Sequence, residues 1–145
     1  MAEKKFMDEH CPVARSLACV GDRWSMLILR DVQRGMTRFD QLRANLGVAP
    51  NILSGRLASL TAEGLLEKRQ YSARPPRHEY VLTEAGQDFI PVLTAIAGWG
   101  YKHRGQRPIA RLVDEATGEA VQPLVIDGAN GAPIGTRPLR LIQPD

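Results

Sequence analysis

Two stretches of this sequence carry side chains suited to contacting duplex DNA. Residues 50–62 form an amphipathic pattern whose polar faces bear short side chains, and residues 72–78 form a loop rich in proline and arginine. Asparagine can pair with the edge of adenine and arginine with that of guanine, so Asn51 and Arg56 are candidate base contacts. Arginine beside a reading helix can bind phosphates or enter the minor groove. The first stretch is therefore expected to read bases, and the second to hold the DNA backbone.

The surrounding elements follow the order of a winged helix-turn-helix. Four helices are expected first, over residues 13–20, 23–33, 38–46 and 50–62. Asp22 can cap the second helix, Thr37 can cap the third, and Gly47 can end the third. The hydrophobic period then changes to that of strands at residues 66–71 and 79–82, which the basic loop connects. This order places the helix over residues 50–62 in the major groove and the hairpin beside it.

A further helix over residues 83–103 precedes a change in the character of the chain. Turn signals at Asp127-Gly128 and Asn130-Gly131 indicate a small β-rich extension. Its expected short strands cover residues 109–113, 120–126 and 139–142. The predicted fold class is α+β, with a mainly helical winged helix-turn-helix domain at residues 1–107 and the β-rich extension at residues 108–145.

Composition narrows the class of protein. The chain has 145 residues, of which 43% are hydrophobic, so it can form a packed core. It has no run of about 20 apolar residues, and its first ten residues lack the apolar segment of a signal peptide. We therefore expect a cytoplasmic protein without a membrane partner. Residues 1–110 carry 16 Lys and Arg against 11 Asp and Glu, a positive balance compatible with binding nucleic acid.

Two other functional classes make different demands on the sequence. An enzyme is not expected, because His10, His78 and His103 have no nucleophile or carboxylate at motif spacing and no glycine-rich phosphate loop follows a strand. No cofactor is expected either. The alternative that stays open is a winged helix that binds another protein instead of DNA. That class favours a neutral, apolar outer face on residues 50–62 and a hairpin without basic residues.

Seven short segments between residues 11 and 103 share their order and spacing with one bacterial family. They are Cys11-Pro12-Val13, Gly21-Asp22-Arg23-Trp24, Leu27-Ile28-Leu29, Arg38-Phe39-Asp40-Gln41-Leu42, Leu53-Ser54-Gly55-Arg56-Leu57, Glu63-Gly64-Leu65-Leu66 and Glu79-Tyr80-Val81-Leu82-Thr83-Glu84-Ala85-Gly86. In them the chain resembles the HxlR-type regulators, of the MarR-like superfamily. The resemblance implies a homodimer that binds an inverted-repeat operator and regulates transcription. With the residue pattern, it gives these candidate DNA contacts: Thr37, Arg38, Pro50, Asn51, Ser54, Arg56, Ser59, Arg69, Arg74, Arg77 and His78.

The resemblance also implies where the two subunits of a dimer meet. Members of the family use the first helix and the helix after the wing, which correspond here to residues 13–20 and 88–101. The candidate interface consists of the apolar residues Val13, Leu17, Ile90, Leu93, Ile96 and Trp99.

Some members of the family sense oxidants or electrophiles through a cysteine that matches Cys11. A helix N-terminus stabilises a thiolate, and Cys11 directly precedes Pro12 at such a start, so Cys11 is a candidate redox sensor. The alternative is a packing cysteine, with a small apolar effector held between the dimer helices. Cys19 lies among apolar residues and is expected in the core.

The extension at residues 108–145 is not part of the pattern that the chain shares with the family. Its turns at Gly118 and Gly131 resemble the knuckles of a zinc-ribbon-like extension found on some relatives. Residues 104–145 contain neither Cys nor His, which tetrahedral structural zinc sites usually require. The extension is therefore predicted to be a β element without metal ligands.

Overall fold

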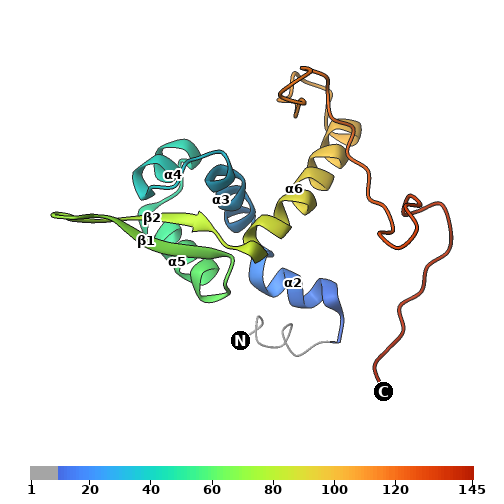
Figure 1. The fold of residues 1–145 in the computed structure, drawn as a ribbon, viewed down its shortest axis with the longest axis horizontal. Helices are drawn as coiled ribbons and strands as arrows, with labels where there is room; N and C mark the ends of the chain where they lie inside the picture. The colour runs from blue at the N-terminus through green and yellow to red at the C-terminus, as the bar shows by residue number, and fades with distance from the viewer. Residues whose placement is uncertain (1–9) are drawn as a thin grey trace. The chain divides into compact units, whose positions relative to one another are not determined.

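The helices and strands follow the expected order along residues 10–145, the part of the chain that this computed structural model describes (Figure 1). In chain order they are α2 (Pro12–Val20), α3 (Arg23–Gln33), α4 (Phe39–Leu46), α5 (Pro50–Ala62), β1 (Leu66–Ala73), β2 (Pro76–Leu82) and α6 (Glu84–His103). The chain forms two units. The first consists of the residues up to Ile90 together with Pro144 and Asp145, and the second runs from Pro91 to Gln143. The domain boundary after residue 107 stays a prediction.

The core of the first unit lies between α3, α4, α5 and the base of the hairpin. Its buried apolar residues are Val20, Ile28, Leu29, Val32, Leu42, Val48, Leu53, Leu57, Leu60 and Leu66. The α+β winged-helix class is confirmed, and so is the central place expected for the second helix, since Ile28 and Leu29 are fully buried. On α5 the buried residues Leu53, Leu57 and Leu60 lie at helical spacing, which leaves the opposite face of α5 in solvent.

A buried carboxylate ties α3 to α4. Asp31 is fully buried and accepts hydrogen bonds from Nε of Arg30 at 2.8 Å and from Nδ2 of Asn45 at 2.7 Å. Asn45 belongs to α4, so this bond joins the two helices that precede α5. A buried charge is tolerated when it is paired in this way. The contact therefore helps to fix the helix-turn-helix.

Local signals explain where α3 begins and where α4 ends. The carboxylate of Asp22 accepts a hydrogen bond from the backbone N–H of Ser25 at 2.9 Å, as expected of the N-cap of α3. Gly47 follows α4 with φ 64°, and its N–H donates to the carbonyl of Arg43 at 2.9 Å. This left-handed conformation favours glycine and ends the helix cleanly.

The expected cap of α4 by Thr37 is wrong. α4 begins at Phe39, one residue later than predicted, and Arg38 is its N-cap residue. The side chain of Gln41 accepts a hydrogen bond from the backbone N–H of Arg38 at 3.1 Å. The hydroxyl of Thr37 instead donates to Glu79 of the hairpin at 3.1 Å. The sequence pattern predicted that the side chain of Thr37 caps α4, but that side chain makes a tertiary contact with the hairpin instead.

Strands β1 and β2 pair antiparallel in a long hairpin that projects beyond the helices of its unit (Figure 1). Leu66 faces Leu82 at its base. The sequence predicted shorter strands and a loop over residues 72–78, whereas most of that segment is strand and only Arg74 and Pro75 form the turn. Each strand of a two-stranded ribbon has a free edge, where proline is tolerated because no ladder bond is lost.

The start of α6 packs closely on the entry to the hairpin. The backbone N–H of Thr83 donates to the carbonyl of Leu65 at 3.1 Å, and the hydroxyl of Thr83 donates to the carbonyl of Gly64. A Cβ atom on Gly86 would lie 2.2 Å from the oxygen of Leu65, so this approach requires glycine. Within residues 10–145, no helix combines the length and apolar character that a membrane span needs.

The three short strands expected in the extension do not form in residues 104–145. Isolated antiparallel bridges join Val113 to Ala120 and Ile126 to Pro133 instead. Pro123 lies inside one predicted strand and cannot donate a ladder hydrogen bond. None of residues 104–145 is buried, so packing against a covering layer does not stabilise longer β-strands there.

The two bridged segments, residues 113–120 and 126–133, are matching turns. In the first, Oδ1 of Asp114 accepts from the backbone N–H groups of Thr117 and Ala116, each at 2.9 Å, and these bonds lower the pKa of Asp114. In the second, Asp127 accepts from Ala129 at 2.9 Å. Gly118 and Gly131 close the turns with φ 73° in each case. Hydrogen bonds from side chains to the backbone therefore stabilise both turns. Within residues 10–145, no cluster of three His, Cys, Asp or Glu residues is arranged to bind a metal.

Candidate nucleic-acid interface

The face of α5 opposite the core presents small and polar residues to solvent. Pro50 begins the helix, and Asn51, Ser54 and Ser59 are exposed. Gly55 lies on this face without a positive φ, and a Cβ atom there would meet nothing within 4 Å. Glycine inside a helix costs about 1 kcal/mol relative to alanine. Neither conformation nor packing explains Gly55, and its bare backbone allows close approach of another molecule.

Arg56 lies on a flank of α5, where it meets the start of α3. Its Nε is 3.4 Å from Oδ2 of Asp22, and its side chain is 37% exposed. Burial alone would raise the pKa of Asp22, but hydrogen bonds from the hydroxyl and backbone N–H of Ser25, with the charge of Arg56, hold that pKa below its ordinary value. The structure thus places Arg56 in an ion pair, apart from the outward face that carries Asn51.

Thr37 and Arg38 lie where the start of α4 meets the hairpin. Glu79 accepts the hydroxyl of Thr37 on one carboxylate oxygen, and its other oxygen is 3.5 Å from Nε of Arg69. The guanidinium of Arg38 lies 4.3 Å from the ring centroid of Tyr71, within the range of a cation–π interaction. These contacts fix the hairpin against the helix-turn-helix and already engage the side chains of Thr37 and Arg69.

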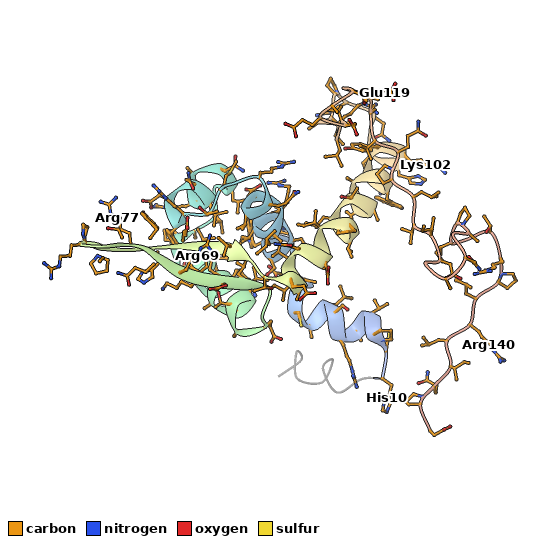
Figure 2. The ribbon with its side chains drawn as sticks, in the orientation of Figure 1. His10, Arg69, Arg77, Lys102, Glu119 and Arg140 are labelled. Atoms are coloured by element: carbon orange, nitrogen blue, oxygen red, sulfur yellow. The ribbon has the colours of Figure 1, made fainter. Side chains whose placement is uncertain are left out.

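The outer part of the hairpin carries the remaining basic candidates. Arg74 lies in the turn, Arg77 and His78 lie on β2 in place of the expected loop, and all three are exposed. Figure 2 shows Arg77 toward the projecting end of the hairpin and Arg69 closer to the helices. Within residues 10–145, no carboxylate forms an ion pair with Arg74 or Arg77. Their guanidinium groups therefore remain available for phosphates.

Helix α2 exposes the apolar residues assigned to its side of a dimer. Val13 is 64% exposed and Leu17 is 49% exposed, one helical turn apart. Cys11 is the N-cap residue of α2, and its free thiol is half-buried. Both apolar side chains thus lie on the helix whose N-cap residue is Cys11.

Cys19 is not in the core as expected. It is half-buried, and the neighbouring Val20 takes the buried position. The thiol of Cys19 donates a hydrogen bond to Oε2 of Glu63 at 3.4 Å. Burial raises the pKa of Cys19, and the hydrogen bond to Glu63 and its negative charge raise it further. Cys19 is therefore held in its neutral thiol form.

The second apolar surface lies on the later part of α6. Val92, Ile96 and Trp99 are about half exposed, at 47%, 48% and 55%, and their spacing of four and three places them on one face. Ile90 and Leu93 are half-buried. The sequence prediction named Ile96 and Trp99 but missed Val92, which the spacing of four from Ile96 could have revealed.

Comparison with known proteins agrees with this geometry. Residues 19–108 match the HxlR-like helix-turn-helix family. The HTH-type transcriptional regulator Rv3095 of Mycobacterium tuberculosis is 42% identical over 116 residues, which cover 79% of this chain and 73% of that protein. The solved structure of PA1607, described as a candidate transcription factor, has a TM-score of 0.85 at 35% identity and covers 95% of this chain and 98% of its own. The redox regulator HypR in its reduced form has a TM-score of 0.61 at 28% identity, covering 65% of this chain and 94% of its own.

The fold and the exposed face of α5 define a winged helix-turn-helix protein. Within that class, the chain belongs to the HxlR-like helix-turn-helix family of transcriptional regulators. The predicted membership of this family is thereby confirmed, and six of the seven sequence segments lie within the matched residues.

Proposed function

We propose that this regulator binds an inverted-repeat operator as a homodimer in the cytoplasm, with α5 in the major groove and the hairpin on the DNA backbone. The observation that carries the proposal is the open face of α5 at Gly55, close to Asn51 and Ser54. A helix without a protruding side chain can approach base edges closely. In a two-fold dimer, half-sites lie about one helical turn apart.

A second copy of the chain is the proposed partner of the exposed apolar surfaces. Single exposed apolar side chains are common on monomers, but a stripe at helical spacing favours a packed partner. Val13 and Leu17 on α2, and Ile96 and Trp99 on α6, have this character. The half-buried Ile90 and Leu93 would border that interface.

We expect the double variant Arg74→Ala/Arg77→Ala to bind operator and unrelated duplex more weakly by similar factors. If each arginine neutralises one phosphate, the slope of log K against log salt becomes shallower by about 2, since each phosphate contributes about 0.9. Fluorescence anisotropy across a salt series measures both effects.

The control Arg111→Ala/Arg140→Ala removes the same charge from the extension. Equal slopes in both double variants would mean that the hairpin does not contact phosphates. If the wild-type chain retained no duplex in a selection from genomic fragments, the protein-binding alternative would replace the DNA proposal.

The proposal includes control of operator binding through Cys11. Cys11 is the N-cap residue of α2, the helix that carries Val13 and Leu17 of the proposed dimer surface. A modified sulfur there would alter the spacing of the two reading helices without touching their outward faces. The thiol of Cys11 is half-buried, so an oxidant or electrophile has partial access to it. HypR, a redox regulator, is among the similar structures.

We expect benzoquinone to abolish operator binding by wild type and by Cys19→Ser, but not by Cys11→Ser. The sulfur adds to the quinone ring and the thiol proton moves to the quinone, so a C–S bond forms without a further oxidant. Gel shifts during a quinone titration measure the loss. Identical behaviour of all three proteins would leave Cys11 as a packing residue.

A further inference from the structure

A cavity of about 570 Å³ lies between α2, the start of α3 and one flank of α5. Val13 and Leu17 supply apolar walls, while Asp22, Arg56 and Glu63 supply charged groups. Sites for small molecules commonly measure about 300–1,000 Å³ and combine apolar walls with a few converging polar groups. The cavity falls within that range of size and is open to solvent, since Val13, Leu17 and Glu63 are exposed.

The charges around the cavity do not balance. The carboxylate of Asp22 accepts two hydrogen bonds from Ser25, at 2.9 and 2.6 Å, and is 3.4 Å from the guanidinium of Arg56. Glu63 accepts a hydrogen bond from the Cys19 thiol at 3.4 Å, and a thiol is only a weak donor. Among the described residues that line the cavity, two carboxylates and one guanidinium leave one negative charge, centred on Glu63.

We propose that this cavity binds a small hydrophobic amine in its protonated form. The ammonium group donates to the carboxylate of Glu63, and the apolar body lies against Val13 and Leu17, at the edge of the proposed dimer surface. A charge-assisted hydrogen bond from an ammonium is stronger than the bond from the thiol of Cys19, which it displaces. The bound amine neutralises the charge left over among Asp22, Arg56 and Glu63.

The position of the cavity links this ligand to regulation, a step that rests on the proposed function. Arg56, Ser59 and Glu63 line the cavity at the end of α5 or on its flank, while the outward face of α5 carries Asn51. A ligand that repositions α5 against α2 changes the fit of that helix to the groove. Amine and operator then alter each other's affinity by the same factor, as linkage requires.

The test uses the full chain without DNA and three matched probes: 4-phenylbutylamine, 4-phenylbutanol and 4-phenylbutyrate. Two-dimensional NMR titrations should show saturable shifts in α2 and α5 with the amine, at an affinity about tenfold above that of the alcohol, as one charged hydrogen bond provides. Glu63→Gln should reduce the amine affinity to that of the alcohol and leave the alcohol unchanged. Glu67→Gln, which removes an exposed carboxylate from β1, should change neither.

Tighter binding of 4-phenylbutyrate than of the amine, or unchanged amine affinity in Glu63→Gln, would overturn the assigned site. Because no DNA is present, this result does not depend on operator binding. An operator gel shift with and without 4-phenylbutylamine then tests the regulatory step. An unchanged operator Kd, with saturable amine binding retained, would overturn coupling while upholding the site.

Discussion

Replacing Asp31 by alanine is expected to lower the free energy of unfolding by about 3 kcal/mol. The variant loses two hydrogen bonds that involve a charged group, each contributing about 1.5–3 kcal/mol. The lower end of this range applies to each bond, because Arg30 and Asn45 both have exposed surface and water can replace the lost hydrogen bonds. A small domain has only about 5–15 kcal/mol in total, so the loss is large. Urea denaturation followed by circular dichroism measures it.

Three further variants separate the pairing of Asp31 from a general effect of removing charge. Asp88→Ala deletes an exposed carboxylate and should change stability by less than about 0.5 kcal/mol. Asn45→Ala removes one of the two bonds and should cost about half as much as Asp31→Ala. The double variant Asp31→Ala/Asn45→Ala should cost less than the sum of the single changes, because both remove the same bond. A loss below about 1 kcal/mol in Asp31→Ala would contradict the structural role given to this contact.

Helix boundaries could be predicted because the signals that set them are local. Asp22 and Ser25 are three residues apart, and Gly47 ends α4 through its own backbone conformation. Thr37 shows where local reasoning fails. Its hydroxyl can serve a helix or a distant carboxylate, and Glu79 lies 42 residues further along the chain. Sequence pattern cannot rank these partners without the tertiary structure.

The same limit applies to the charged residues of the candidate site. Arg56 was predicted from its residue type and its place on a polar helix, but its partner Asp22 belongs to another element. The hydrophobic pattern of residues 23–33 gave no sign that Asp31 is buried, because its partner Asn45 is on α4. Both cases depend on how the helices pack. Exposed positions such as Asn51 were easier, since they follow directly from the apolar stripe of α5.

The extension differs in another way. Its apolar runs predicted strands on either side of the turns at Asp114 and Asp127, but only single bridges form there, because no covering layer buries their apolar side chains. The two turns share an aspartate at the start and a glycine four residues later. Turns at Gly118 and Gly131 were predicted from the sequence, and the structure has both.

Filling the open face of α5 at Gly55 is expected to have opposite effects on stability and on DNA binding. Gly55→Ala should raise the free energy of unfolding by about 1 kcal/mol, because alanine favours the helix and its Cβ meets nothing within 4 Å. Gly55→Leu should also be stable, since leucine is a good helix former. Its longer side chain would nevertheless hold α5 away from the base edges. Losing one or two base contacts of about 1–3 kcal/mol each lowers operator affinity by about a hundredfold.

Denaturation and operator anisotropy on the same protein samples measure the two effects together. Gly128→Leu is a matched control, because Gly128 has no positive φ and its Cβ would also meet nothing within 4 Å. It should leave operator affinity unchanged, since Gly128 lies in the extension, which carries neither a proposed DNA contact nor a proposed dimer contact. Wild-type affinity in Gly55→Leu would mean that the outward face of α5 does not enter the groove. A stable variant that no longer binds would show that glycine is present at this position for the approach of DNA, and that the fold gives up about 1 kcal/mol to keep it.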